Sequence, residues 1–441
     1  MIKYFIFFSV LISGVPLGYY LSKINIKFEK VIFFLSIFFT CNMIDINFVS
    51  RENYRGTTRG FEVGLVDITL IILTCLIYSR SHLYKIIIWP QGSTLYLIYF
   101  LISCLSIVNA GIGLYSAFEV LTMLRMYFFY WVMVNYIREP EQLYLLMKIF
   151  AIITIYVFLQ VMYQKYLLGI FQTYGPFPHQ NSMVMYMSIL GSLLLSYSIN
   201  EHRTKLIIWG VIFLMTAFCI ISSLSRAGLV LFIFNCSLIL FFSFVTRSRM
   251  RTIKKKKLLV IFSIPIIVML VLIKAWDTIS ERFNTAPKES AETRVILAEA
   301  AIKMANDKTL GIGLNNFGLK INDPYPYNNH FPEKTLRNEK TGGLVETIYL
   351  MIAAETGWFN LFIFLCFIFN FYFSNLRNYL YYKKTSINFI SIAFIGGLSS
   401  IYVQSTLEWV LKQTNNYYQL MLVFAIIATL TRWRKHKRVV I

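Results

Sequence analysis

Three charged residues of this chain are of types and at positions that could take part in a reaction: Arg226, Arg294 and Glu346. Arg226 lies within residues 222–229, a stretch of small residues between two apolar runs. Its guanidinium offers a planar fork of donors that suits a phosphate group. An arginine that extends its head to the lipid headgroups would occupy the same position, so this alternative stays open.

Arg294 lies in the longest polar segment, residues 275–343, and Glu346 follows directly after it. Two fixed positive charges that meet on one diphosphate would stabilise its departure as a leaving group, although a loop arginine is often only a solvated surface residue. Glu346 is placed to take a proton from a hydroxyl, while a carboxylate at a helix N-terminus is favoured by the helix dipole in any case. We treat all three residues as catalytic candidates.

Further ionisable groups lie within apolar runs, where each costs roughly 2.5–3.5 kcal/mol on insertion and needs a partner or a function. They include Asp67, Glu119, Arg125, Glu355 and Glu408. Glu355 lies about 13 Å deeper than Glu346 if the helix between them is straight. We expect Glu355 to be the buried partner of an arginine such as Arg125, and we count Arg125 among the substrate-binding candidates.

Two irregular segments supply aromatic, amide and imidazole groups. Residues 322–331 are rich in Asn, Pro and Tyr, which suits contact with sugar rings but is also the composition of an ordinary surface loop. Residues 174–182 lead into an apolar run, where a histidine is usually a helix cap. His330 is a catalytic candidate as a base near neutral pH. The remaining substrate-binding candidates are His179, Asn181, Tyr325, Tyr327 and Tyr349.

The elements that position these residues are membrane helices. Of the 441 residues, 57% are hydrophobic and only 14% are charged, with a mean hydropathy of +0.61, which excludes a soluble globule. A bilayer core of roughly 30 Å needs about 20 apolar residues per helix. We expect an all-α polytopic protein with twelve or thirteen helices, at 4–22, 30–48, 62–79, 94–109, 115–136, 146–168, 182–199, 205–222, 227–246, 257–274, 346–374, 387–407 and 414–431.

The net charge of +21 is concentrated in alternate loops, which indicates membrane orientation rather than nucleic-acid binding. Basic clusters occupy residues 247–257 and the tail at 432–441, with further basic residues at 377–384. These regions and the C-terminus are therefore expected in the cytoplasm, and residues 275–343 outside. The same alternation places residues 49–61 outside, although Arg51, Arg55 and Arg59 fit that side poorly.

We expect one membrane domain, residues 1–441, with residues 275–343 as an inserted external loop and residues 432–441 as a basic cytoplasmic tail. Within the loop, residues 292–305 are typical of an amphipathic helix. Its apolar stripe is predicted at Val295, Ala298, Ile302 and Ala305. The glycines at 311 and 313 should end this helix in a tight turn.

The sequence contains no signature of a bound cofactor. All six cysteines lie in apolar runs, a pattern that favours neither a disulfide framework nor a metal cluster. No Walker loop, dinucleotide glycine motif or metalloprotease histidine pair occurs. We therefore expect no cofactor and no metal.

Several motifs together resemble one known superfamily. Residues 223–229, Arg294 with residues 305–317, and residues 349–357 are similar, in order and spacing, to the O-antigen ligase and polysaccharide polymerase superfamily. Residues 177–181 also look like a segment found in such proteins. The resemblance covers roughly residues 170–430, and the first third of the chain agrees only in hydropathy.

The resemblance implies a GT-C-like, metal-independent glycosyltransferase of the bacterial inner membrane. Such enzymes move a glycan from undecaprenyl diphosphate to an acceptor hydroxyl on the periplasmic side, and Arg226 and Arg294 match the family arginines that engage the diphosphate. Ligases of the family place a His-Asn pair before the Tyr-Leu at 349–350, where this chain has Glu346 and Thr347. This departure favours a polymerase of surface-polysaccharide repeat units over a ligase.

In the expected mechanism, Arg226 and Arg294 hold the leaving diphosphate, Glu346 takes the acceptor proton, and Tyr325, Tyr327 and Phe331 support the sugars. The expected partners are the lipid-linked oligosaccharide, an acceptor glycan or lipid A-core, membrane lipids and a chain-length regulator, with no nucleic acid. A ligase acting on lipid A-core, a flippase for lipid-linked oligosaccharides and a purely structural membrane component remain the alternatives. A flippase usually shows paired halves, and we find no internal repeat in this sequence.

Overall fold

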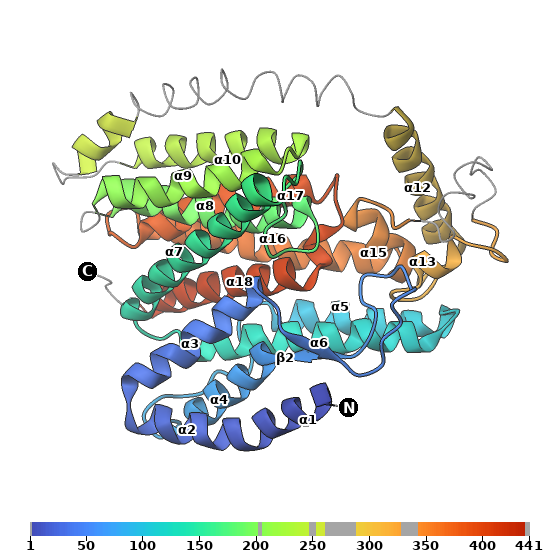
Figure 1. Ribbon diagram of the computed structural model, residues 1–441, viewed down its shortest axis with the longest axis horizontal. Coiled ribbons are helices and arrows are strands. Elements are labelled where there is room, and N and C mark those ends of the chain that lie inside the picture. Colours follow the sequence, from blue (N-terminus) through green and yellow to red (C-terminus); the bar gives the residue numbers. More distant parts are fainter. Residues whose placement is uncertain (1, 202–204, 247–252, 261–287, 328–342, 437–441) are drawn as a thin grey trace. The chain divides into compact units, whose positions relative to one another are not determined.

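The computed structural model describes residues 2–201, 205–246, 253–260, 288–327 and 343–436 (Figure 1). Helices dominate these residues, and the strands found there form only a two-stranded antiparallel sheet of β1 (Asp45–Asn47) and β2 (Glu62–Gly64). The expected all-α polytopic membrane architecture is therefore confirmed. His330, Phe331 and the rest of residues 328–342, together with residues 275–287, lie outside the described residues.

Six helical stretches among the described residues are long and apolar enough to cross a membrane: Tyr4–Ile24, Gly113–Tyr136, Pro140–Leu167, Gln180–Asn200, Arg226–Val245 and Trp358–Tyr381. Four shorter apolar helices match other predicted runs: Leu65–Ser79, Ser93–Asn109, Leu206–Ser222 and Asn388–Gln404. Most of the run predicted at 257–274 lies outside the described residues. The total of twelve or thirteen spans stays a prediction.

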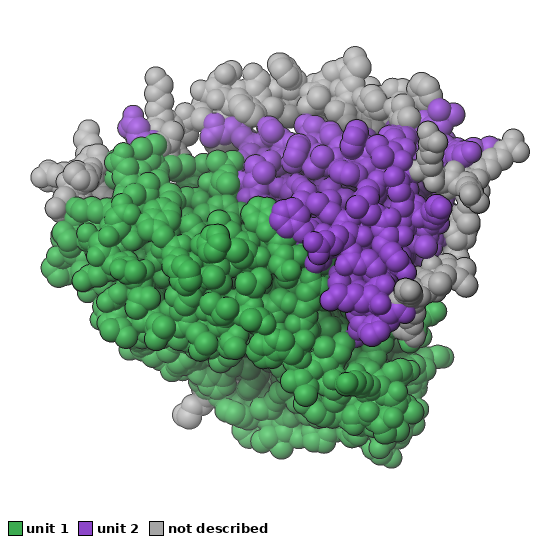
Figure 2. All heavy atoms as spheres, turned by 180° about the vertical axis from the view of Figure 1, so that it is seen from behind, with its two compact units in different colours: residues 1–142, 293–371, 405–429 green, residues 143–292, 372–404, 430–441 purple. Residues whose placement is uncertain are grey.

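The chain divides into two compact units, shown in different colours in Figure 2. Unit 1 comprises residues 1–142, 293–371 and 405–429, and unit 2 comprises residues 143–292, 372–404 and 430–441. Because each unit combines segments that are distant in sequence, hydropathy along the chain could not reveal this division.

The N-terminal part of unit 1 is a group of packed helices with a sheet-tethered loop between α3 and α4. Helices α2, α3 and α4 pack against one another, and α4 packs on α6. The sheet pairs Ile46 with Val63 and thereby closes the loop of residues 48–61. The elements are α1 (Ile2–Ser9), η1 (Val10–Gly14), α2 (Val15–Ile24), α3 (Ile26–Cys41), α4 (Leu65–Ser79), α5 (Ser93–Leu105), η2 (Ser106–Asn109) and α6 (Gly113–Tyr136).

The C-terminal part of unit 1 contains the polar segment that carries Arg294. Its elements are α12 (Lys288–Asp307), α13 (Phe317–Lys320), α15 (Ile348–Thr356), α16 (Trp358–Tyr381), η4 (Val410–Lys412) and α18 (Thr414–Lys435), of which α12, α16 and α18 extend into unit 2. The helix predicted at 292–305 is confirmed as part of α12. Its predicted apolar stripe is wrong at Val295 and Ile302, which are exposed, and correct at Ala305, which is buried. The buried face also includes Leu297, Ala301 and Met304.

The run predicted as one span at 346–374 is two helices. Helix α15 ends at Thr356 and α16 begins at Trp358, because Gly357 adopts φ +87°, which a helix does not allow. A Cβ at Gly357 would lie 2.0 Å from the carbonyl oxygen of Thr309. The break is therefore tied to the approach of a distant backbone segment, which no local pattern indicates.

Unit 2 is built around α8 (Gln180–Asn200), in which every residue from Ser182 onward is buried. Helix α8 packs against α9 (Leu206–Ser222), α10 (Arg226–Val245) and α17 (Asn388–Gln404). Small residues allow these helices to approach closely, and Asn235 of α10 donates to the backbone carbonyl of Ser188 at 3.1 Å. The unit also contains most of α7 (Pro140–Met162) and η3 (Tyr163–Leu167).

Candidate active site

The glycine turn at residues 310–314 docks directly on the end of α15. The amide nitrogens of Ile312 and Gly313 donate to the carbonyl oxygens of Ala354 and Glu355, at 2.9 and 3.0 Å. Gly311 and Gly313 have φ angles of +68° and +111°, as the predicted turn requires. A Cβ at Gly311 would lie 2.4 Å from the Glu355 backbone, so only glycine permits this contact.

Two buried asparagines after the turn connect it to the N-terminal part of unit 1. The side chain of Asn315 accepts a hydrogen bond from the amide of Thr57 at 2.9 Å and donates to the carbonyl of Tyr115 at 2.8 Å. Asn316 accepts from the amides of Gly111 and Ile112, each at 3.1 Å. These bonds hold the loop 48–61, the start of α6 and the glycine turn together as one surface of unit 1.

A buried charge cluster lies beneath this surface. Lys412 Nζ is 3.4 Å from Glu119 Oε1 and 3.4 Å from Glu355 Oε2, and all three side chains are no more than 5% exposed. Glu119 also accepts a hydrogen bond from Thr57 Oγ1 at 2.9 Å. Since the cluster contains two carboxylates and one ammonium, Lys412 is the group on which both glutamates depend.

The expected pairing of Glu355 with Arg125 is wrong. Arg125 instead donates to Asp67 through Nε and Nη2, at 3.0 and 2.7 Å, and lies 3.6 Å from Asp45. Its side chain is 6% exposed. An arginine bound this way could not reach a ligand at the protein surface without leaving its aspartates, so its geometry favours a role in holding α4 to α6.

Arg294 and Glu346, two of the catalytic candidates, meet in unit 1. Arg294 Nη2 lies 2.5 Å from Glu346 Oε2 and 3.7 Å from Glu408 Oε1. The Arg294 and Glu346 side chains are 44% and 33% exposed, whereas that of Glu408 is 10% exposed. An accessible guanidinium flanked by two carboxylates can bind an anion if it exchanges one partner for another.

The environment of Glu346 suits a base. Burial raises the pKa of the Glu346 carboxyl above its ordinary value, while the charge of Arg294 opposes this rise. Glu346 precedes α15, and the amide of Ile348 donates to the carbonyl of Ser405 at 3.2 Å. A ligand that draws Arg294 away would therefore raise the pKa of Glu346 further and strengthen it as a proton acceptor.

Arg226, the third catalytic candidate, lies in unit 2, at the first residue of α10. The turn before it contains Leu224 at φ +52°, and Ser225 caps the helix by accepting from the amide of Gly228 at 3.3 Å. This geometry confirms the predicted helix break between two apolar runs. The N-terminus of α10 adds its positive partial charge to the guanidinium, and both favour an anion.

The candidates from residues 174–182 also lie in unit 2. His179 is the N-cap of α8, and its Nδ1 accepts a hydrogen bond from the amide of Asn181 at 3.3 Å. Burial lowers the pKa of His179, so the imidazole is held in the neutral form that a cap requires. Asn181 is in the first turn of the same helix, and its carbonyl accepts from Gln404 at 3.4 Å.

The aromatic candidates of unit 1 belong largely to its packing. Tyr327 is 7% exposed, and its hydroxyl donates to Asp307 at 2.9 Å. Tyr325 packs against a hydrophobic cluster that contains Tyr327 and Phe317, and Lys320 Nζ lies 5.4 Å from the Tyr325 ring centroid. Tyr349 is half-buried in α15. These positions make the segment around Tyr325 a packed wall of unit 1.

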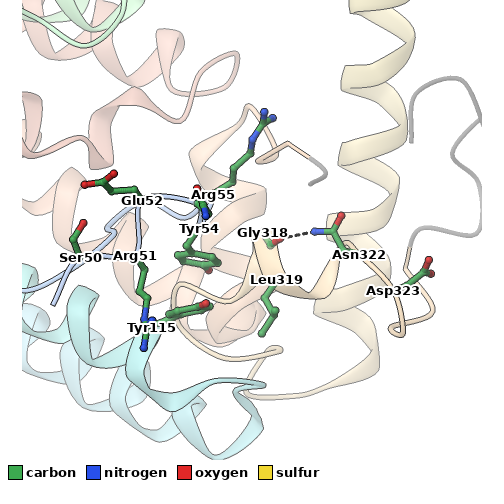
Figure 3. A pocket seen from close by; sticks show the side chains of 11 residues that line it. Ser50, Arg51, Glu52, Tyr54, Arg55, Tyr115, Gly318, Leu319, Asn322 and Asp323 are labelled. Atoms are coloured by element: carbon green, nitrogen blue, oxygen red, sulfur yellow. Dashed lines mark hydrogen bonds between the residues drawn. The ribbon is translucent and has the colours of Figure 1, made fainter. Parts of the chain in front are cut away.

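A cavity of about 630 Å³, which we name the Tyr54 pocket, opens between the loop 50–55 and residues 318–323 (Figure 3). The rings of Tyr54 and Tyr115 stack within it, with centroids 3.8 Å apart. Figure 3 shows Arg51 extending beside Tyr115 and Arg55 pointing away from the rings. Two of the three arginines that fit an external loop poorly, Arg51 and Arg55, thus line a pocket with residues 318–323.

The sequence reading missed the residues that organise this site. Asn315 and Asn316 directly follow the glycine turn, and their adjacent amides were the available signal. Lys412 is the one basic residue in the short gap between the runs at 387–407 and 414–431. The sequence marks Glu408 as an intramembrane charge but does not indicate its neighbour Arg294. Within the described residues, no group of His, Cys, Asp and Glu side chains is arranged to hold a metal ion.

Comparison with known proteins identifies one family. A family model described as O-antigen ligase matches residues 211–365. The matched segment contains Arg226, Arg294, the glycine turn and Glu346. A search of curated proteins finds no match. The chain is a multi-pass membrane protein, and the similarity of residues 211–365 to this family supports the expected O-antigen ligase and polysaccharide polymerase superfamily.

Proposed function

We propose that the protein is a membrane glycosyltransferase that joins lipid-diphosphate-linked repeat units into a surface polysaccharide. The observation that carries this proposal is the accessible Arg294–Glu346 pair, at 2.5 Å, inside the segment that matches the family. One member of the pair suits the leaving diphosphate, and the other suits the incoming hydroxyl. The family supports glycan transfer in general, and the choice of polymerisation is our own inference.

The reaction is a single displacement at the anomeric carbon. The oxygen of the acceptor hydroxyl forms a bond to this carbon, the bond from the carbon to the diphosphate oxygen breaks, and the electron pair leaves with the diphosphate. Arg294 stabilises the charge that develops on the leaving group, and Arg226 is a second candidate for this role. Glu346 receives the proton of the acceptor hydroxyl.

The ion pair couples donor binding to base strength. In the unliganded protein, Arg294 lowers the pKa of Glu346 against the effect of burial. A diphosphate that takes over Arg294 removes this influence and adds negative charge nearby, so the pKa of Glu346 rises. Glu408, 3.7 Å from Arg294, keeps the guanidinium in place during the exchange. The base is therefore strengthened when the donor is bound.

The experiment uses purified protein in lipid nanodiscs, supplied with repeat units on undecaprenyl diphosphate. We expect the wild-type protein to lengthen the glycan and to release the lipid diphosphate. Arg294→Ala and Arg226→Ala should each reduce this rate by 100-fold or more, the order found when a charge-stabilising donor is removed. Normal elongation by both variants would refute the proposal.

Lys303→Ala is a matched control for Arg294→Ala, because it removes a positive charge from another exposed position of α12 without touching Glu346. Lys303 contacts the carbonyl of Pro326 at 3.2 Å. Its substitution should leave elongation within about twofold of wild type. An equal loss in both variants would mean that the net charge of α12, rather than the position of Arg294, determines activity.

A ligase is the second candidate, because the matching family model is described as O-antigen ligase. Glu346 and Thr347 stand where the resembling ligases have His and Asn, which disfavours it. The same assay separates the two functions. Elongation with lipid-linked repeat units alone supports a polymerase, whereas transfer only after lipid A-core is added supports a ligase.

A further inference from the structure

The Tyr54 pocket is separate from the charged side chains assigned to the reaction, yet it belongs to the same unit. Neither Arg294 nor Glu346 lines it. Its volume of about 630 Å³ lies within the range of small-molecule sites, roughly 300–1,000 Å³. Gly318 in its wall lies against Leu344, two residues before Glu346: a Cβ at Gly318 would be 3.6 Å from the Leu344 side chain.

The walls of the pocket are held in place before any ligand binds. The Tyr54 hydroxyl donates to the carbonyl of Asn315, and Tyr54 stacks on Tyr115 with an interplanar angle of 20°. A Cβ at Gly318 would lie only 1.9 Å from the carbonyl oxygen of Arg55, so the two walls meet backbone to backbone. A preorganised site avoids the entropy cost of ordering loops on binding.

The side chains that line the pocket suit an uncharged, hydroxyl-rich ligand. Two guanidinium groups, Arg51 and Arg55, are matched by two carboxylates, Glu52 and Asp323, and Asn322 adds an amide. Sugar hydroxyls both donate and accept hydrogen bonds, so they can use all of these groups. A diphosphate would meet repulsion from the carboxylates that offsets attraction by the arginines.

We propose that the Tyr54 pocket binds the acceptor saccharide, with the sugar hydroxyls held between Arg51, Glu52 and Asn322. This inference rests on the proposed glycan transfer and adds to it a separate site for the second substrate. The approach of Gly318 to Leu344 links the pocket wall to the segment that leads to Glu346. Basic residues of the loop 48–61 thereby gain a function in acceptor binding.

The test measures binding of a delipidated saccharide. Repeat-unit oligosaccharide is released from its lipid diphosphate by mild acid and titrated into wild-type protein and variants in nanodiscs. Arg51→Gln and Glu52→Gln should each raise the Kd about tenfold, the effect of losing one charged hydrogen bond. Arg59→Gln is the matched control, because Arg59 is exposed in the same loop but does not line the pocket.

Three results would overturn the inference: no binding to the wild-type protein, unchanged binding to Arg51→Gln and Glu52→Gln, or equal weakening by Arg59→Gln. Titration with inorganic diphosphate supplies a fourth, because an anion site would lose diphosphate affinity in Arg51→Gln. Melting temperatures equal to that of wild type confirm that the exposed substitutions leave the protein folded.

A further variant separates this inference from the proposed function. Glu346→Gln should abolish transfer and leave oligosaccharide affinity unchanged, because Glu346 does not line the pocket. If the wild-type protein binds the oligosaccharide through Arg51 but transfers nothing, the pocket stands as a saccharide site and the proposed function fails. If the wild-type protein transfers glycan and the oligosaccharide affinity is unchanged in Arg51→Gln and Glu52→Gln, only the pocket assignment fails.

Discussion

Replacing Lys412 with methionine should destabilise unit 1 more than any change to its carboxylate partners. Lys412 Nζ lies 3.4 Å from both Glu119 and Glu355, and the three side chains are almost fully buried. At this distance and an effective dielectric constant of about 20, each attraction amounts to about 5 kcal/mol before desolvation. Breaking a buried pair by removing one partner costs about 3–5 kcal/mol net, because the remaining charge is left unpaired.

Glu355→Gln makes the comparison quantitative. It leaves one lysine facing one glutamate, and the glutamine can still accept the hydrogen bond from the Phe317 amide, which lies 3.4 Å from Glu355 Oε1. We expect a cost of about 1 kcal/mol, the value of one ordinary hydrogen bond. The triple variant Lys412→Met, Glu119→Gln and Glu355→Gln should recover part of the loss of Lys412→Met, since no buried charge remains.

Cys41 provides a local probe for this measurement. It is fully buried, and its carbonyl accepts a hydrogen bond from Asn415, three residues after Lys412, at 3.1 Å. A thiol-reactive fluorophore, applied to a variant that keeps only Cys41, would report unfolding of this region on heating. The reasoning is refuted if Lys412→Met melts at the same temperature as Glu355→Gln, because the cluster would then be balanced without its lysine.

Two further predictions follow from the site. Burial raises the pKa of Glu346, and the base acts as the carboxylate, so the transfer rate should be constant above this pKa and fall as the pH drops through it. The acid limb of the rate profile should therefore lie above the ordinary glutamate pKa and move to higher pH in Arg294→Gln. An acid limb that Glu346→Gln leaves unchanged would contradict the assignment. Gly357→Ala should lower the free energy of unfolding by more than the roughly 1–3 kcal/mol of a strained backbone, because its Cβ would overlap the Thr309 carbonyl. Gly210→Ala is the control: no atom lies within 4 Å of a Cβ at Gly210, so this variant should melt at the temperature of wild type.

Prediction of the helices from sequence succeeded where the signal was local. Apolar runs located most membrane helices to within a few residues, and small residues around Arg226 marked a true helix break. It failed for the face of α12, because Val295 and Ile302 are exposed while smaller neighbours such as Ala301 are buried. Alanine, valine and isoleucine occur on all sides of this helix, so hydrophobic periodicity does not distinguish its buried face from its exposed face. The packing partners determine which face is buried.

Prediction of charge partners failed for a related reason. The sequence favours a pair of Arg125 and Glu355, because both are intramembrane charges of opposite sign, yet Arg125 binds Asp67, and Glu355 binds Lys412. Burial penalises every unpaired charge equally, so it requires a partner but does not choose one. The choice depends on which helices pack together, and that depends on contacts between residues far apart in the chain.

The amino-acid sequence by itself determined that this protein lies in a membrane, where its helices run, and that Arg226, Arg294 and Glu346 deserve chemical interest, because apolar run length and the cost of buried charge are local properties. Only the tertiary structure decided that Arg294 and Glu346 form a pair, that Lys412 joins Glu119 to Glu355, and that the loop 50–55 shares a pocket with residues 318–323. Those outcomes require backbone segments separated by tens to hundreds of residues to meet, and the glycines at 311, 318 and 357 permit those meetings through close backbone contacts that have no signature along the chain.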